Sequence, residues 1–523
     1  MDDLELFARA ATHGDRVAIV DGTGAYTYRK LLEQSARIAD AVARTSMPAD
    51  RPRVVYLIDA GFDHAAVQWG IWRAGAIGVP ISAMQAPAEW SYVISDADAE
   101  LAVADAPVAP ALREAAGSVR VATTEELIRS GPAGRRGRAR VGSSLDELRL
   151  NGTPVANDAA LILYTSGTTG KPKGVVLTHA NVEAQVRCLV AAWEWRADDR
   201  ILHVLPLNHV HGIVNVLTCA LWAGATCEML GKFDAPDAWT AIAAGRLTLF
   251  MAVPTVYSKL IAAWDTAPAE QQRAMSNGCR AMRLMVSGSA ALPVRVLDRW
   301  RDVSGHTLLE RYGMTEIGMA LSNPLKGERR PGFVGVPLPG VQVRIVDEQG
   351  KEVEAASPGE LEVQGPGVFR EYWRRPDATA AAFRDGWFRT GDVAVYEDGM
   401  YRLLGRQSVD IIKCGGYKVS ALEIEEVLRG HPAVAECAVV GVEDAEWGER
   451  IVAAIVSRGP GTVDIDSLRD WARPHLARYK LPTRMVVVPE LPRNAMGKVS
   501  KPGVKRLFES AGGSTDSFKT HNR

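Results

Sequence analysis

The chain has 523 residues, a formal net charge of −1 and 47% hydrophobic side chains. A charge so close to neutral excludes the basic footprint of a nucleic-acid-binding protein, and no apolar run approaches the roughly 20 residues of a membrane-spanning helix. The length exceeds one ordinary hydrophobic core, so we expect about two to four domains or lobes, with room to bury small-molecule substrates.

Cysteine usage and the first residues bear on the compartment. The six cysteines show neither C-x-x-C spacing nor a cluster with histidine. This argues against a disulfide framework or a zinc site and favours a reducing environment. The chain opens with acidic residues, without a long apolar core or an Arg-rich and Ser-rich leader, so we expect a cytoplasmic enzyme without membrane insertion. Nothing in the sequence indicates an oligomeric state.

Short apolar runs alternate with helical patterns through the first part of the chain, and each run ends in Gly, Pro, Ser or Thr. Such runs lie at residues 159–166, 200–207, 247–254 and 282–290. The alternation predicts an α/β fold, in which a large amino-terminal domain with several subdomains contains layered sheets and helices.

The pattern changes twice in the last third. From about residue 342, alternating strands broken by Gly turns predict an antiparallel subdomain. Farther on, Ser420 and Glu423 form a capping-box pattern before a helix, and a second helix is expected at about 467–478. With several strands between them, these helices predict a small α+β carboxyl-terminal domain. Residues 511–523 are polar and rich in Gly and Ser, which predicts a disordered tail.

A loop rich in glycine, hydroxyl and lysine side chains follows the first of these strands, in the stretch ILYTSGTTGKPKGVVLTH at 162–179. Glycines let backbone N–H groups converge on phosphate oxygens, hydroxyls add donors, and lysines add positive charge. A Walker A loop is excluded, because Pro172 stands where that motif has its metal-binding Ser or Thr. The predicted polyphosphate cradle consists of Thr165, Ser166, Gly167, Thr168, Thr169, Gly170, Lys171 and Lys173.

This loop resembles the signature of the adenylate-forming superfamily, which includes acyl-CoA synthetases and peptide-synthetase adenylation domains. Further family motifs follow in the same order: YGMTE at 312–316, TGD at 390–392, GR at 405–406, GGYKVSALEIE at 415–425 and PRNAMGK at 492–498. The resemblance covers nearly the whole chain. It implies that a carboxylate and magnesium-ATP form an acyl-adenylate and pyrophosphate, and that a thiol, usually coenzyme A, then takes the acyl group.

The resemblance also implies a domain arrangement. The amino-terminal domain with the ATP and acyl pockets would comprise 1–405, a hinge 406–410, and a mobile carboxyl-terminal domain 411–510. The segment QSVDIIKC between Arg406 and Gly415 is one residue longer here than in many family members, so the pivot stays open between Gln407, Ser408 and Asp410.

The motifs imply catalytic roles for three residues. Lys498 resembles the family's catalytic lysine, whose ammonium offsets the repulsion between a carboxylate and the α-phosphate; read alone, a carboxyl-terminal lysine is a solvated charge. Thr315 resembles a phosphate contact, and Glu316 resembles the ligand of Mg²⁺, a hard ion that prefers oxygen. Without the loop, the Thr-Glu pair is only a helix-start pattern.

Other motif residues are implied to surround the nucleotide and the thiol. Their alternatives are a packed core tyrosine, a turn aspartate, a surface arginine and simple glycine turns. The implied nucleotide contacts are Tyr312 for adenine, Asp392 and Arg406 for ribose, and the turn of Ser287, Gly288 and Ser289; the implied coenzyme A passage is Gly415 and Gly416.

Arg311, directly before YGMTE in an apolar segment, bears on the choice of substrate. A guanidinium beside a hydrocarbon tail would lose its hydration without return, whereas a second carboxylate would form a bidentate pair with it. Through HVHG at 209–212, VSGSAALP at 286–293 and the motifs above, the chain resembles malonyl-CoA synthetases most. This implies malonate as substrate, and methylmalonate as a second one, because one methylene-sized contact discriminates by only about 1–3 kcal/mol.

Further candidate ligands of the second carboxylate are His209, His211, Lys259 and Ser287. Metal ligation by the two histidines lacks a nearby third ligand, and two buried histidines without substrate contact remain an alternative. If Arg311 instead faces an internal acid such as Glu310 or Glu316, a short-chain or aromatic monocarboxylate would fit. An alternative outside enzymes is a nucleotide-binding interaction protein that has lost catalysis.

Overall fold

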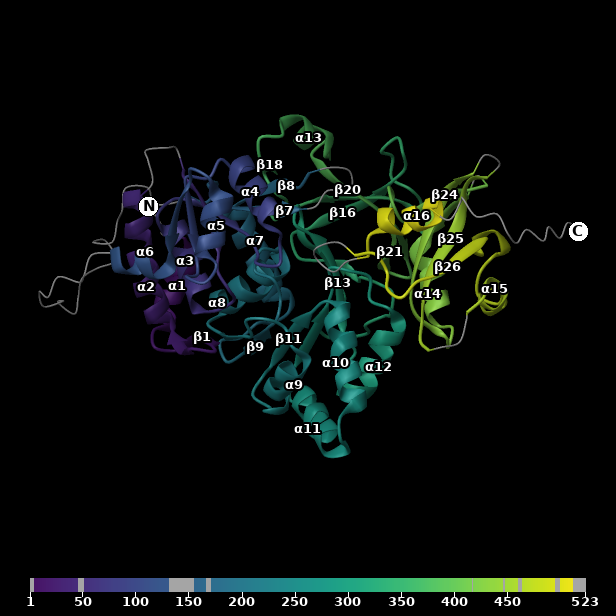
Figure 1. Cartoon of the computed structure of the whole chain (residues 1–523), viewed down its shortest axis with the longest axis horizontal. Helices are drawn as coiled ribbons and strands as arrows, with labels where there is room; N and C mark the ends of the chain where they lie inside the picture. The colour runs from purple at the N-terminus through teal and green to yellow at the C-terminus, as the bar shows by residue number, and fades with distance from the viewer. Residues whose placement is uncertain are drawn as a thin grey trace, which may run out of the picture. The chain divides into compact units, whose positions relative to one another are not determined.

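The computed structural model describes residues 4–45, 51–130, 155–165, 171–415, 417–444, 447–459, 463–493 and 499–510. Some predicted features lie outside them, namely the tail at 511–523 and the site residues Ser166, Gly167, Thr168, Thr169, Gly170, Gly416 and Lys498. The chain divides into two compact units (Figure 1). The larger comprises 1–292, 296–343 and 362–389, and the smaller comprises 293–295, 344–361 and 390–523.

Two sheets of mostly buried strands form the larger unit. The nine-stranded sheet has the order β15 (Val336–Pro337), β14 (Gly318–Ser322), β13 (Leu309–Met314), β12 (Leu284–Ser287), β11 (Leu249–Ala252), β9 (Arg200–His203), β10 (Thr226–Met229), β1 (Val17–Asp21) and β2 (Gly24–Thr27). The seven-stranded sheet has the order β18 (Glu371–Tyr372), β8 (Lys173–Thr178), β7 (Ala159–Thr165), β4 (Ile77–Pro80), β3 (Arg53–Leu57), β5 (Leu101–Ala104) and β6 (Arg120–Thr123).

Helices cover these sheets with apolar faces. Trp239, Tyr257 and Trp300 join the strands of the first sheet in one hydrophobic cluster, and Trp90 and Leu112 join those of the second. The helices are α1 (Glu5–His13), α2 (Tyr28–Thr45), α3 (Phe62–Arg73), α4 (Pro87–Asp96), α5 (Ala109–Ala116), α6 (Thr124–Ser130), α7 (His179–Ala192), the π-helix η2 (His211–Thr218), α8 (Cys219–Ala223), α9 (Ala235–Ala243), α10 (Pro254–Thr266), α11 (Ala269–Arg280), α12 (Val294–Ser304) and α13 (Pro376–Ala381).

A third sheet follows in chain order, with the strands β16 (Gln342–Val346), β17 (Gly359–Gln364), β20 (Trp387–Glu397), β19 (Phe383–Arg384) and β21 (Met400–Arg406). β20 pairs antiparallel with both β19 and β21. The antiparallel character predicted from about residue 342 is confirmed for these pairs.

The fourth sheet lies in the smaller unit. Its strands are β23 (Tyr417–Ser420), β22 (Ile411–Cys414), β25 (Gly448–Ser457), β24 (Val434–Asp444) and β26 (Arg484–Val487). Alternate residues of β24 enter two separate clusters, one with α14 (Ala421–Arg429) and α15 (Ile465–Ala472), the other with α16 (Lys501–Ser510). Since successive side chains of a strand point to opposite faces, helices cover both faces of this sheet (Figure 1).

Local signals in the smaller unit are partly confirmed. The Ser420 hydroxyl accepts a hydrogen bond from the Glu423 N–H at 3.2 Å and caps α14, as predicted. The helix expected at about 467–478 begins at Ile465 and ends at Ala472, and a 3₁₀ turn, η3, follows at Arg478–Lys480.

Candidate active site

Arg311 lies in β13, the strand between β12 and β14. β13 runs parallel to β12, where Ser287 pairs with Glu310, and antiparallel to β14, where Arg311 pairs with Ser322. Leu309, at the start of the strand, is fully buried. The hydrophobic strand therefore carries the arginine into the interior, where only 2% of Arg311 is exposed.

Among the described residues, the guanidinium of Arg311 has a single hydrogen bond, donated by Nη2 to the Ser289 hydroxyl at 3.4 Å. Within the described residues, Nε and Nη1 have no hydrogen-bond partner and no carboxylate is within ion-pair distance. Burial lowers the pKa of Arg311 to about 9, because the charged form loses hydration that nothing in the fold replaces. Glu310 and Glu316 therefore do not supply the counter-charge.

The turn after β12 lies directly against this guanidinium. A Cβ at Gly288 would meet the Arg311 Cζ at 2.6 Å, so any larger residue there would displace the guanidinium from this position. Ser289 has a φ of +68°, a left-handed conformation uncommon for serine. Its hydroxyl is 3.2 Å from His211 Nδ1. The backbone turn thus brings Ser289 between the arginine and the histidine.

His211 is the first residue of the π-helix η2, a rare form that is frequently found at functional sites. Ser287 lies at the end of β12, fully buried, and its hydroxyl has no hydrogen-bond partner among the described residues. Ser289 thus links the buried side chains of Arg311 and His211, and the buried Ser287 lies two residues before it.

The sequence also predicts His209 and Lys259 for the acyl pocket. His209 is half-buried and its carbonyl accepts from the Ile213 N–H at 3.0 Å. Lys259 is exposed on α10, with its ammonium 5.9 Å from the centre of the Phe233 ring. Tyr257, two residues earlier, turns inward and donates to the Val286 carbonyl at 2.8 Å. Residues two apart face different sides of a helix, so the structure does not bring Lys259 to Arg311.

The two lysines of the phosphate loop each face an aromatic ring. Thr165 ends β7 and pairs with Lys173 at the start of β8, which closes the base of the hairpin. The Lys171 ammonium lies 5.6 Å from the centre of the Tyr92 ring, and the Lys173 ammonium lies 5.0 Å from that of Tyr372. Both positive charges therefore lie beside the loop predicted to bind phosphate.

Thr315 and Glu316 form the turn between β13 and β14. The Tyr372 hydroxyl donates to Glu316 Oε1 at 3.0 Å, and the Phe369 N–H donates to the Glu316 carbonyl at 2.7 Å. The described residues contain no group of three or more possible metal ligands. A half-buried carboxylate near residues predicted to bind phosphate still fits Mg²⁺, which proteins often hold by one or two carboxylates plus substrate phosphates.

Tyr312 is buried beside this turn and pairs with Leu321 across β13 and β14. In the smaller unit, Asp392 and Arg406 occupy paired positions of β20 and β21, and Arg406 Nε donates to Asp392 Oδ1 at 3.0 Å. The structure thus brings together the pair predicted to bind ribose.

Gly415 lies at the end of β22 with a φ of +57°, and a Cβ there would meet the Trp447 ring at 2.9 Å. Both facts require glycine. This requirement follows from the fold alone and leaves the predicted role of Gly415 in the coenzyme A passage as a prediction.

Residues 6–373 match the AMP-binding enzyme family, and residues 423–498 match the carboxyl-terminal domain of AMP-binding enzymes. The chain belongs to this family. It is 44% identical to the human mitochondrial malonate–CoA ligase ACSF3, over 96% of this chain and 92% of that one. It is 38% identical to an Arabidopsis thaliana malonate–CoA ligase, over 96% and 88% of the two chains.

Among solved structures, ATP-bound MatB from Rhodopseudomonas palustris superposes on this AMP-binding enzyme with a TM-score of 0.86. The two sequences are 33% identical, and the match covers 98% of this chain and 100% of that one. The predicted superfamily and the predicted two-domain α/β class are therefore confirmed. No helix among the described residues combines the length and apolar character needed to cross a membrane.

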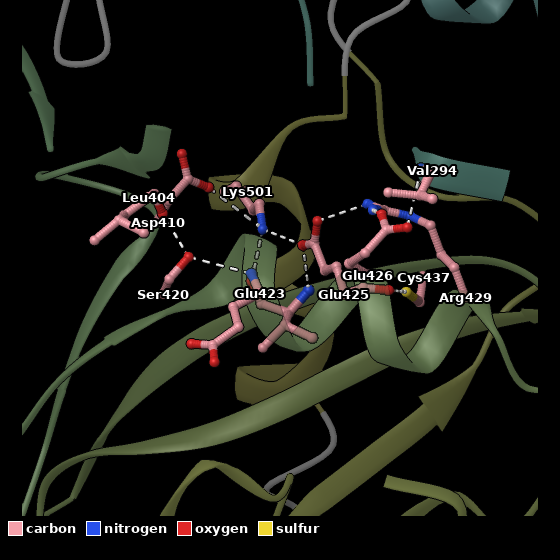
Figure 2. A network of polar contacts seen from close by, with 11 residues as sticks. Val294, Leu404, Asp410, Ser420, Glu423, Glu425, Glu426, Arg429, Cys437 and Lys501 are labelled. Atoms are coloured by element: carbon pink, nitrogen blue, oxygen red, sulfur yellow. Dashed lines mark hydrogen bonds and ion pairs between the residues drawn. The ribbon is translucent and has the colours of Figure 1, made fainter. Parts of the chain in front are cut away.

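The smaller unit of this AMP-binding enzyme also contains a buried network that the motifs did not indicate (Figure 2). Glu425 of α14 accepts from the Val439 N–H at 2.8 Å and from Arg429 at 2.7 Å, and it forms an ion pair with Lys501. Lys501 also lies 3.5 Å from Asp410, in the predicted hinge. The Asp410 carboxylate in turn accepts from the Arg406 N–H at 3.0 Å.

Proposed function

We propose that this enzyme is an ATP-dependent malonate–CoA ligase, which also accepts methylmalonate. The observation that carries the proposal is the buried Arg311 guanidinium, which has no counter-charge among the described residues. A buried charge without a partner costs several kcal/mol, which a substrate anion would recover. The names of the human and Arabidopsis relatives support the same substrate.

Malonate suits this position because it has two carboxylates. One would form a charge-assisted pair with Arg311, whose planar fork fits a carboxylate, with Ser289, His211 and Ser287 as further hydrogen-bonding groups. The other would remain free to react. An added methyl group changes little charge, which is why we extend the proposal to methylmalonate.

In the first step, an oxygen of the free carboxylate attacks the α-phosphorus of ATP, and pyrophosphate leaves. Thr165, Lys171, Lys173 and Thr315 would bind phosphate oxygens, and Glu316 would hold Mg²⁺. The ion, when bound, supplies positive charge. Together with Lys498, it would offset the negative charge of the phosphates. Residues 166–170 are proposed to complete the phosphate contacts, Tyr312 to face adenine, and Asp392 with Arg406 to bind ribose.

In the second step, the thiol of coenzyme A attacks the acyl carbon, a thioester bond forms, the thiol loses its proton and AMP leaves. We propose that the thiol arm enters beside Gly415 and Gly416. For this step, the carboxyl-terminal domain at 411–510 would turn against 1–405 about a hinge at 406–410.

The test is a panel of acetate, propionate, malonate, methylmalonate and succinate with ATP, Mg²⁺ and coenzyme A. Pyrophosphate release reports the first step and thioester formation the second. We expect malonate to have the highest kcat/KM, followed by methylmalonate. Preference for acetate or propionate would overturn the dicarboxylate proposal, and no pyrophosphate release with any acid would overturn the enzymatic one.

We further propose that the enzyme acts in the cytoplasm, where malonyl thioester would serve fatty acid metabolism. The human relative carries a mitochondrial designation in its name, so the two locations are alternatives. Cell fractionation with antibody detection of the full chain decides between them, and recovery with mitochondria would overturn the cytoplasmic proposal.

A further inference from the structure

Two tyrosines support the two lysines of the phosphate loop in the same way. Lys171 faces the Tyr92 ring, and Lys173 faces the Tyr372 ring. Neither lysine forms an ion pair with any residue that the structure describes. An aromatic face attracts an ammonium without neutralising it, so each lysine is held in place while its charge stays available for phosphate.

The hydroxyl groups of these tyrosines have different acceptors. Tyr92, on α4, donates to the Pro172 carbonyl at 2.7 Å. Tyr372, on β18, donates to the Glu316 carboxylate at 3.0 Å. Only the second hydroxyl therefore contacts a group proposed to bind the metal.

The surrounding backbone fixes Tyr372 between its two partners. Tyr372 pairs with Val175 of β8, two residues after Lys173. Three residues before Tyr372, the Phe369 N–H donates to the backbone carbonyl of Glu316 at 2.7 Å. Tyr372 is almost fully buried, at 9% exposed. The same short segment thus holds the phosphate-loop strand, the Glu316 backbone and the Glu316 side chain.

We propose that Tyr372 is a positioning residue for magnesium-ATP. Its hydroxyl orients the Glu316 carboxylate for the metal, while its ring orients Lys173 for the phosphates. Hydrogen bonds that orient a ligating carboxylate raise metal affinity, because the carboxylate is fixed before the metal arrives. The inference rests on the proposed role of Glu316 as the Mg²⁺ ligand.

The test compares Tyr372→Phe with Tyr92→Phe, since each keeps its ring over a lysine and loses only its hydroxyl. The full chain is mixed with saturating ATP in EDTA and titrated with Mg²⁺, and the rise in Tm over ATP alone is recorded. We expect Tyr372→Phe to need about tenfold more Mg²⁺ for the half-maximal rise. Tyr92→Phe should titrate like the wild-type enzyme, and Glu316→Gln should lose the Mg²⁺-dependent rise.

The outcomes separate this inference from the proposed function. If Tyr372→Phe titrates like wild type while Glu316→Gln does not, Tyr372 has no positioning role and the role of Glu316 stands. If Glu316→Gln also titrates like wild type, the metal role of Glu316 is itself wrong.

A double variant covers the case in which Tyr372→Phe lowers the Tm without ligand. Glu316→Gln/Tyr372→Phe should then respond to Mg²⁺ as Glu316→Gln does, because the hydroxyl acts through that carboxylate. A further loss in the double variant would mean that Tyr372 supports only the fold, and the inference would be overturned.

Discussion

Arg311 in the larger unit and Glu425 in the smaller are both buried ions, but the fold treats them in opposite ways. Arg311 has one hydrogen bond of 3.4 Å and no counter-charge among the described residues. Glu425, 3% exposed, is bound by Lys501, Arg429 and a backbone N–H (Figure 2). A charge satisfied within the fold is structural, whereas a charge left without a partner points to a ligand.

The pKa shifts describe the same difference. Burial lowers the pKa of Arg311, which means that the cation is disfavoured where it lies. Burial alone would raise the pKa of Glu425, but Lys501 and Arg429 outweigh it, and the pKa of this carboxyl is lowered. The fold therefore stabilises the Glu425 anion, and the described residues supply no counter-charge to the Arg311 cation.

The largest effect is expected from breaking the satisfied ion. Glu425→Gln leaves Lys501 and Arg429 buried with a neutral partner, so the free energy of unfolding of the smaller unit should fall by about 3–5 kcal/mol. Amide hydrogen exchange of α14 and β24, measured at increasing denaturant concentration, gives this free energy of unfolding. Unchanged exchange there would contradict the structural role of Glu425.

The second effect concerns catalysis. Arg311→Ala should weaken transition-state binding of malonate by about 2–5 kcal/mol, seen as a fall in kcat/KM, because the substrate's second carboxylate loses its partner. The free energy of unfolding should not fall, since no internal ion pair is lost. Propionate turnover is the control, and Arg311→Lys tests whether charge suffices without the guanidinium fork. Wild-type kcat/KM on malonate in Arg311→Ala would refute the dicarboxylate site.

The third effect is ligand stabilisation, which should separate the two ions. Malonate at a hundred times its Kd should stabilise the wild-type enzyme by about 2.7 kcal/mol. Malonate should stabilise Glu425→Gln by the same amount, although this variant is less stable without malonate. It should not stabilise Arg311→Ala. Thermal unfolding with and without malonate measures both, and stabilisation of Arg311→Ala by malonate would place the anion elsewhere.

The smallest effect is expected from pH. Because the folded pKa of Glu425 lies below the ordinary value of 4.5, its contribution is present above that value and is lost as pH falls through the folded pKa. The stability difference between wild type and Glu425→Gln should therefore narrow in acid. The free energy of unfolding of Arg311→Ala should change with pH as that of the wild type does in this range, because Arg311 stays protonated there. A constant difference for Glu425→Gln would show that its charge is not what stabilises the unit.

The motif residues and their order along the chain could be predicted from the sequence. The directions in which their side chains point could not. Spacing placed Arg311 beside the YGMTE motif, yet only the strand register shows that its side chain meets Gly288 and Ser289. Lys259 was placed in the pocket from motif position alone. Helical periodicity puts it on a different side from Tyr257, a signal that the sequence did contain.

Other differences have equally specific causes. The helix expected to reach residue 478 ends at Ala472, because Pro474 has no backbone N–H with which to continue the hydrogen bonds of the helix. Glu425 stands between apolar positions of an amphipathic helix, where a carboxylate is ordinarily unexpected. Its partner Lys501 is far away in sequence, so no local pattern joins them. Tyr372 was missed for the same reason, since Glu316 comes from another part of the chain.

The space that a side chain would fill at Gly288 is taken by the Arg311 guanidinium. The residue types that positions 288 and 311 can hold are therefore coupled. Glycine at position 288 leaves room for the cation at position 311. A larger residue at 288 would displace that cation or require a different residue at 311. An enzyme of this family that carries alanine and arginine at these two positions and still prefers a dicarboxylate would show that the two positions are not coupled.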